Sequence, residues 1–195
     1  MKVAYGLKAH SGWAALIVLG KRDVGWVLVD RRRIELVEEE WAKQPYHAAA
    51  ELKGDEARKL VKCGIDSAFS IAMQEMSAAV KREREQKNEV VACAVLVGNP
   101  MPKWSVDEIL AVHFRMHQAE GVLFRDALVH AARKCKLDVI EVPEKTLVSY
   151  AEQSLKVSSN ELSKRISAIG KLAGPPWGKD QKEAALAAML AFSSD

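Results

Sequence analysis

Three β-type runs separated by short connections begin this chain, and no other feature constrains its fold as strongly. The runs cover residues 2–7, 12–19 and 24–30 and are separated by Ser11-Gly12 and by Gly20-Lys21-Arg22-Asp23. Parallel strands need a crossover of about a dozen residues or more, which these connections cannot supply. The pattern therefore predicts an antiparallel three-stranded meander, which residues 33–37 either extend or follow.

Helices and two further strands are expected after the meander. Apolar residues recur at three- and four-residue spacing over residues 55–86, which predicts one long amphipathic helix. Residues 89–97 are almost continuously apolar, as in a central strand that is covered on both faces. We then expect two helices within 105–135 with a break near Gly121, a strand at 137–142, and closing helices at 146–155, 159–171 and 179–192.

This order predicts an α/β fold in which the meander and two parallel strands form a mixed five-stranded sheet, with helices on both faces. The length of 195 residues and the 49% share of hydrophobic residues indicate one sizeable core. No repeat, low-complexity tract or long linker interrupts the order of elements, which predicts a single domain, residues 1–195. No run approaches about 18 apolar residues, so we expect no membrane-spanning helix and no membrane partner.

The cysteines and the net charge indicate the compartment and the class of partner. The three cysteines lie far apart without C-x-x-C spacing, which favours free buried thiols in a cytoplasmic protein. Lys8 and His10 interrupt the first strand-like stretch, which argues against a signal peptide. The net charge of +3 permits nucleic-acid binding but does not indicate it.

Four short segments carry a resemblance to a known family. In chain order they are Gly6-Leu7-Lys8-Ala9-His10-Ser11, Ala119-Glu120-Gly121-Val122-Leu123, Val139-Ile140-Glu141-Val142-Pro143-Glu144-Lys145 and Asp180-x-x-Glu183-Ala184-Ala185-Leu186-Ala187. On these segments the chain, from residue 6 to residue 191, resembles the RuvC-type Holliday junction resolvases of the ribonuclease H-like superfamily. The resemblance implies a ribonuclease H-like fold, a structured nucleic acid as ligand and a homodimer.

The resemblance also implies a metal site, which this chain carries only in part. Nucleases of this fold use about four carboxylates to hold two divalent metals. Asp180 and Glu183 match the two acids of the closing helix. Lys8 stands where the family has its first-strand aspartate, the window 90–97 contains no acid for the fourth strand, and Glu89 lies at the wrong end of that strand.

A lysine at a metal position changes the electrostatics of the whole site. A dication about 4 Å from an ammonium costs several kcal/mol even at an effective dielectric constant of about 20. We therefore hypothesise a vestigial site, without metal or cofactor, in which Lys8 pairs with Asp180 or Glu183. The plainer interpretations are a snorkelling lysine and acids that favour the first turn of a helix. His10 could contact a phosphate or transfer a proton, or be a solvated turn residue.

Two further clusters are candidates for binding. Arg31, Arg32 and Arg33 suit phosphate contacts and are the predicted nucleic-acid-binding residues, although the acids at 38–40 could neutralise them. His113, His117 and Glu120 share one helix face at i, i+4 and i+7. Zinc sites use such a histidine pair, but the usual acid beside the first histidine is missing, so we expect a polar helix face and no metal.

Two classes of function remain open. The favoured class is a catalytically degenerate RuvC-like protein that binds structured DNA or RNA, or a protein partner, as a possible homodimer. The alternative is an active endonuclease dependent on Mg²⁺ or Mn²⁺. It would use Asp180, Glu183 and His10, with Glu89 or Glu141 as a further acid.

Overall fold

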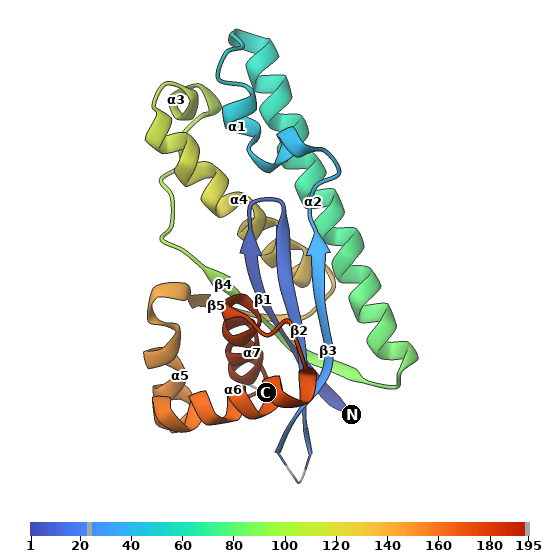
Figure 1. Ribbon diagram of the computed structural model, residues 1–195. Coiled ribbons are helices and arrows are strands. Elements are labelled where there is room, and N and C mark those ends of the chain that lie inside the picture. Colours follow the sequence, from blue (N-terminus) through green and yellow to red (C-terminus); the bar gives the residue numbers. More distant parts are fainter. Residues whose placement is uncertain (23–24, 194–195) are drawn as a thin grey trace.

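A five-stranded mixed sheet forms the centre of the computed structural model, which describes residues 1–22 and 25–193 (Figure 1). The strands are β1 (Lys2–His10), β2 (Trp13–Arg22), β3 (Gly25–Glu35), β4 (Glu89–Val97) and β5 (Asp138–Pro143). Their order in the sheet is β3-β2-β1-β4-β5. The pairs β1–β2 and β2–β3 are antiparallel, while β1–β4 and β4–β5 are parallel. The predicted meander and mixed sheet are confirmed.

The helices expected from the sequence appear in the predicted order with one difference, and the structure adds three short helices that were not predicted, at residues 40–43, 45–48 and 144–146. In chain order the helices are η1 (Glu40–Lys43), α1 (Pro45–Ala48), α2 (Gly54–Glu85), α3 (Val106–Leu110), α4 (His113–Lys134), η2 (Glu144–Thr146), α5 (Leu147–Leu155), α6 (Ser159–Ala173) and α7 (Lys179–Phe192). The expected break near Gly121 is wrong, because α4 continues through it. A helical glycine costs only about 1 kcal/mol relative to alanine, and buried residues on both sides of Gly121 fix the helix. The break lies instead at Val112, whose backbone is extended.

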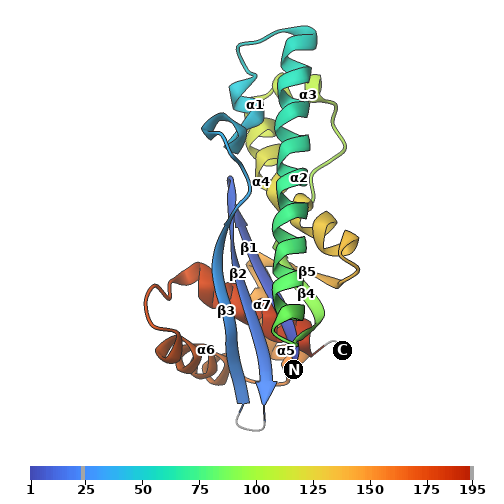
Figure 2. The same ribbon diagram turned by 90° about the vertical axis from the view of Figure 1, so that its right-hand side faces the viewer.

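Helices cover the sheet on both faces, as expected. Alternation along β1 sends Val3, Tyr5 and Leu7 to the face covered by α2 and α4. Ala4 belongs to the opposite face, which α5, α6 and α7 cover. Figure 2 shows α2 along one side of the sheet and α6 on the other. Lys8 lies four residues after Ala4 on the same strand. The alternation of side chains therefore directs Lys8 to the same face of the sheet as Ala4, which α7 covers.

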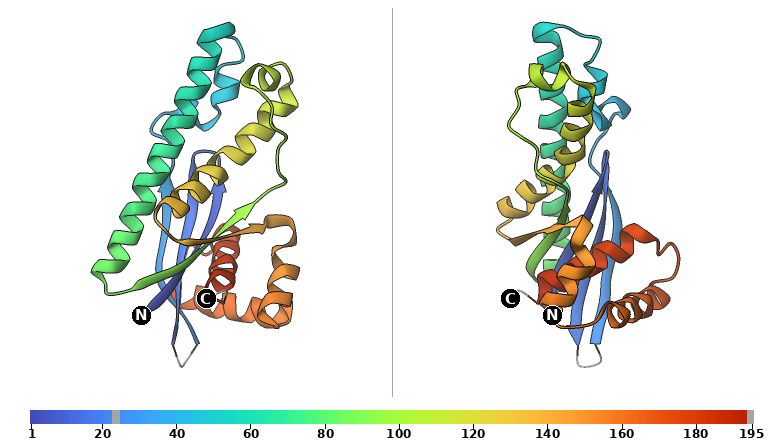
Figure 3. Two further views of the ribbon diagram at one scale, coloured as in Figure 1. Left: turned by 180° about the vertical axis from the view of Figure 1, so that it is seen from behind. Right: turned by 90° about the vertical axis from the view of Figure 1, so that its left-hand side faces the viewer.

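Part of the molecule projects beyond the sheet. The first half of α2, together with α1, α3 and the start of α4, forms a separate apolar cluster that includes Tyr46, Val61, Ile109 and Met116. Figure 3 shows this helical extension above the sheet, on the side opposite both chain termini. The extension holds α1 against α4.

Gly6 sets the distance between β1 and α7. A Cβ atom at this position would lie 1.8 Å from the carbonyl oxygen of Ala184 and 2.5 Å from the backbone nitrogen of Ala188. The helix backbone therefore occupies the space that a side chain would need. This close approach brings the first turns of α7 against the carboxyl end of β1, where Lys8 lies.

Two composition-based expectations can be compared with the structure. In the described part of the chain, no helix combines the length and the apolar character that a bilayer span requires. The three cysteines are free, but only Cys93 is buried, whereas Cys63 is exposed and Cys135 is half-buried. The expectation of three buried thiols is therefore wrong for Cys63, which lies on an outer face of α2.

Candidate functional site

The candidate site lies at the edge of the sheet where the parallel strands end. β1 reaches this edge with Lys8 and His10, while β5 reaches it at Pro143 and is followed at once by Glu144. The first turns of α7 bring Asp180 and Glu183 to the same place. The carboxyl edge of parallel strands is where open α/β sheets usually place their ligands.

Lys8 is the centre of this cluster. Its side chain is only 5% exposed, and its Nζ atom lies 3.2 Å from Glu144 Oε1 and 3.4 Å from Asp180 Oδ1. The ammonium also donates a hydrogen bond to Glu183 Oε2. Three carboxylates thus surround one ammonium group, and the contact predicted between Lys8 and the acids of the last helix is present. We call Lys8, His10, Glu144, Asp180 and Glu183 the lysine cluster.

The carboxylates keep Lys8 charged in spite of its burial. Burial alone lowers the pKa of a lysine, but the hydrogen bonds to Glu183 and Glu144 outweigh it, so the pKa of Lys8 is raised above its ordinary value of 10.5. A charged ammonium is the form that three nearby carboxylates require. Lys8 is therefore a permanent cation at neutral pH.

His10 and Asp180 form a second contact in the cluster. His10 Nε2 lies 3.0 Å from Asp180 Oδ1, and the imidazole stacks on Trp13 with ring centroids 4.4 Å apart. Burial raises the pKa of Asp180, but the hydrogen bond with His10 and the charge of Lys8 have the larger combined effect and lower it below 3.8. His10 thus contacts Asp180 and Trp13, although its side chain is 37% exposed.

Two further cations pair with the same acids. Arg125 of α4 lies 3.1 Å from Glu144 Oε2, and Lys179 lies 3.6 Å from Glu183 Oε1. The three carboxylates are thus matched by three side-chain cations, counting Lys8, before any contribution from His10. The site is already close to electrically neutral.

The family that this chain resembles has a metal-binding acid on its fourth strand, and β4 has no counterpart to it. Leu7 of β1 pairs with Val95 of β4, and the next residue along β4, Leu96, is fully buried in the apolar core. Glu89 pairs with Lys2 at the far end of the strands. Glu141 forms an ion pair with Arg133, at 2.7 Å. Glu89 is therefore too far along the sheet to join Asp180 and Glu183 in a metal site. Glu141 is already paired with Arg133.

Sequence reasoning missed Glu144 and Arg125. Glu144 directly follows the carboxyl end of a strand that is parallel to β4 and β1, and that position was a usable signal. Arg125 lies in the middle of α4, and nothing in its spacing distinguishes it from an ordinary surface arginine. Only the packing of α4 against the sheet brings it to Glu144.

A cavity of about 510 Å³ opens beside the lysine cluster. Its polar and charged lining residues include Gln118, Arg125, Glu144, Lys145, Lys179 and Glu183. Lys145 and Lys179 are exposed at its rim. The cavity therefore presents cationic side chains to solvent while the acids beneath are already paired.

The arginine triplet on β3 makes contacts within the chain. Arg31 donates to the carbonyl oxygens of the loop at 174–176, with the shortest contact of 2.6 Å to Pro176. Arg32 pairs with Asp30, while Arg33 pairs with Glu35 and lies 4.0 Å from the ring centroid of Trp13. The flanking acids on β3, rather than residues 38–40, pair with Arg32 and Arg33. Nucleic-acid binding by these arginines stays a prediction.

The expectation of a polar face on α4 needs correction. Glu120 is buried, with 4% exposure, and its partner is His47 of α1. His113 and His117 are exposed, and their Nε2 atoms lie 3.0 Å apart. The structure thus adds a third histidine to the pair that the spacing identified.

Comparisons with known proteins bear on the architecture. No family model matches the chain, and no curated protein matches its sequence. The solved structure of Thermus thermophilus RuvC aligns with 96% of this chain and 92% of its own, with a TM-score of 0.54 and 13% identity. T. thermophilus RuvC in complex with a Holliday junction substrate aligns with 97% of this chain and 92% of its own, with a TM-score of 0.51 and 13% identity.

The chain has a RuvC-like fold. The coverage extends over almost the whole of both chains, so the ribonuclease H-like arrangement of the sheet and its helices is common to them. At 13% identity the likeness establishes the fold, and the function has to be argued from the site.

Proposed function

We propose that this chain is a catalytically degenerate RuvC-like protein that binds structured nucleic acid and does not cut it by a two-metal mechanism. The observation that carries the proposal is the Lys8 ammonium, which lies among Glu144, Asp180 and Glu183. Two-metal nucleases need carboxylates that are free to bind cations. Here a covalently attached cation already pairs with all three acids.

The charge balance opposes metal entry. Two unit charges about 4 Å apart interact by roughly 4 kcal/mol at an effective dielectric constant of about 20, so the repulsion between Lys8 and a dication at that distance is about twice that amount. Arg125 and Lys179 add further repulsion, because each already pairs with one of the acids. Mg²⁺ could enter only if these side-chain cations moved out of the cluster.

The same charges favour phosphate at the rim of the site. Exposed Lys145 and Lys179 line the 510 Å³ cavity, and Arg125 lies deeper within it. Backbone phosphates can pair with these cations without disturbing the buried ammonium. The likeness to RuvC in complex with a Holliday junction substrate supports a branched DNA as the ligand.

The proposal extends to a homodimer, which the resemblance to RuvC-type resolvases implies. A dimer would present two such cavities to one branched nucleic acid. The mass of the free protein by light scattering during size-exclusion chromatography tests this part separately. A monomer at every accessible concentration would contradict the dimer and leave the binding proposal intact.

Fluorescence anisotropy with a labelled four-way DNA junction tests the binding proposal. We expect the junction to bind more tightly than a duplex of the same sequence, with an affinity that falls steeply as salt is raised. The double variant Lys145→Gln/Lys179→Gln should weaken binding and reduce the salt slope by about 2, because each lysine that pairs with a phosphate contributes about 1 to that slope. Lys182→Gln is the matched control, because Lys182 is an exposed lysine on the same helix as Lys179.

Incubation of the same junction with Mg²⁺ or Mn²⁺ tests the claim of degeneracy. The account predicts an intact junction after prolonged incubation. Metal-dependent cleavage that Asp180→Asn abolishes would establish the competing endonuclease function instead. Absence of salt-dependent junction binding would contradict the nucleic-acid proposal and favour a protein partner.

A further inference from the structure

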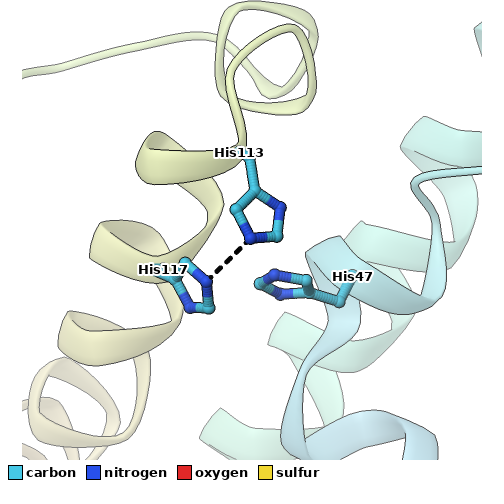
Figure 4. Close-up of side chains that lie close together, drawn as sticks. All are labelled: His47, His113 and His117. Carbon is cyan, nitrogen blue, oxygen red and sulfur yellow. Dashed lines mark hydrogen bonds between the residues drawn. The ribbon is translucent and has the colours of Figure 1, made fainter.

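Three imidazoles converge between α1 and α4, in the helical extension beyond the sheet. His47 approaches from α1, while His113 and His117 project from successive turns of α4 (Figure 4). One ring nitrogen from each histidine lies within 4.8 Å of the other two. We call these residues, together with Glu120, the histidine cluster.

Glu120 fixes the orientation of His47. The Oε2 atom of this buried carboxylate lies 2.7 Å from His47 Nδ1, and Oε1 accepts hydrogen bonds from the backbone N–H groups of Tyr46 and His47. A carboxylate at Nδ1 favours the tautomer with its proton on that nitrogen. His47 Nε2 is then left with a free lone pair.

That lone pair has no partner within the described part of the chain. His47 Nε2 is buried and makes no hydrogen bond to the residues that the structure describes. A buried polar atom without a partner costs free energy unless something else satisfies it. The two other imidazoles lie in front of it, with ring centroids 5.0 Å away for His113 and 4.6 Å away for His117.

The spacing of the three nitrogens suits a small metal ion. Zinc binds imidazole nitrogen at about 2.0–2.1 Å, so two nitrogens on a tetrahedral ion are about 3.3 Å apart. The Nε2 atoms of His113 and His117 are 3.0 Å apart, and small rotations of exposed side chains would bring the third nitrogen into the same shell. Imidazole favours zinc and similar transition metals, whereas Mg²⁺ prefers oxygen ligands.

We infer that His47, His113 and His117 form a zinc site through their Nε2 atoms, with Glu120 as the residue that positions His47. The contact from Glu120 to Nδ1 is the outer-shell partner that metal-binding histidines commonly have. Three histidines leave a fourth position for water. The ion would join α1 to α4, which lie far apart in the sequence, and its site shares no residue with the lysine cluster.

Titration of untagged, metal-stripped protein with Zn²⁺ against a chromophoric chelator tests this site. We expect one ion per chain, and Co²⁺ should give the visible absorption bands of a four-coordinate ion with nitrogen ligands. His113→Gln and His117→Gln should each weaken zinc binding by more than about 100-fold, because each removes a direct ligand rather than an outer-shell partner. Both side chains are exposed, so these variants should fold normally, which circular dichroism without metal checks.

His130→Gln is the matched control, since His130 is an exposed histidine on the same helix whose ring packs against Phe69. It should bind zinc like the unaltered chain. Glu120→Gln retains an acceptor but removes the negative charge, and should weaken binding by about 10- to 100-fold.

The inference is overturned if the unaltered protein binds zinc no more tightly than His113→Gln and His117→Gln. It is equally overturned if His130→Gln causes the same loss, because the binding would then be a general property of surface histidines. Neither result bears on whether the chain binds nucleic acid, so the two proposals can fail separately.

Discussion

The lysine cluster and the histidine cluster contrast two ways of arranging ionisable side chains near one cavity. His10 of the lysine cluster and Glu120 of the histidine cluster both line a cavity of about 210 Å³. In the lysine cluster each carboxylate has a cationic side chain within 3.6 Å. In the histidine cluster the buried His47 Nε2 has no hydrogen-bond partner among residues 1–22 and 25–193.

The difference shows that the ligand types alone do not determine where a metal binds. Carboxylates are good ligands for Mg²⁺, but those around Lys8 are already neutralised by groups of the protein itself. The three imidazoles can each offer a nitrogen lone pair to one ion, and the buried Glu120 carboxylate places a negative charge beside His47. The chain is thus expected to bind a metal away from the position that its fold would indicate.

The largest effect is expected from removing the charge of Lys8. Lys8→Met keeps the length of the side chain but leaves three carboxylates without their shared cation. Breaking a buried ion pair by removing one partner costs about 3–5 kcal/mol, and we expect a loss near 3 kcal/mol because the acids are partly exposed. Urea unfolding at neutral pH measures it.

Lys182→Met is the control for Lys8→Met, since Lys182 is exposed on α7, and it should change stability by no more than about 0.5 kcal/mol. Zinc binding by the histidine cluster should be unchanged in both variants. Equal stability of Lys8→Met and the unaltered chain would show that the lysine cluster contributes little.

A smaller effect is expected when α7 is pushed away from β1. Gly6→Ala places a Cβ atom 1.8 Å from the Ala184 carbonyl oxygen, so the helix must move. Overpacking of this kind costs about 1–3 kcal/mol, and we expect the upper end because the contact is with backbone. Thermal unfolding measures it.

Gly121→Ala is the opposite case, because nothing lies within 4 Å of the added Cβ atom on α4. It should stabilise the chain by up to about 1 kcal/mol through helix propensity. Stabilisation by Gly6→Ala would contradict the close packing that brings Asp180 and Glu183 to Lys8.

The smallest effect is on the pH dependence of stability. The pKa of Asp180 is lowered below 3.8 in the folded chain, so its contribution is present above that pH and is lost as the pH falls through the folded value. The pKa of Lys8 is raised above 10.5, so its contribution is complete below that pH and is lost only at higher pH.

Asp180→Asn should therefore reduce the loss of stability on acidification. The loss of stability at alkaline pH should be unchanged, because it depends on Lys8. Urea unfolding midpoints between about pH 5 and about pH 2 measure the change. If stability falls equally on acidification in Asp180→Asn and in the unaltered chain, the ionised Asp180 is not stabilised by its cationic neighbours.

The sequence predicted the meander and the central strand, because short connections and the spacing of apolar residues limit the topology. It predicted the contact between Lys8 and the last helix from the resemblance to RuvC-type resolvases. It failed at Gly121, where burial of the neighbouring turns outweighs the low helix propensity of glycine. It could not predict His47 as a partner of His113 and His117, because α1 is a short helix within a connection. Only its packing against α4 brings the imidazoles together.

The most direct test of the central claim is a calorimetric titration with Mg²⁺ of the unaltered chain and of Lys8→Asp. Mg²⁺ suits this test because it prefers oxygen ligands and does not compete for the histidine cluster. The account predicts no binding by the unaltered chain and binding by Lys8→Asp, in which four carboxylates meet at the site. Binding of Mg²⁺ by the unaltered chain that Asp180→Asn abolishes would contradict it.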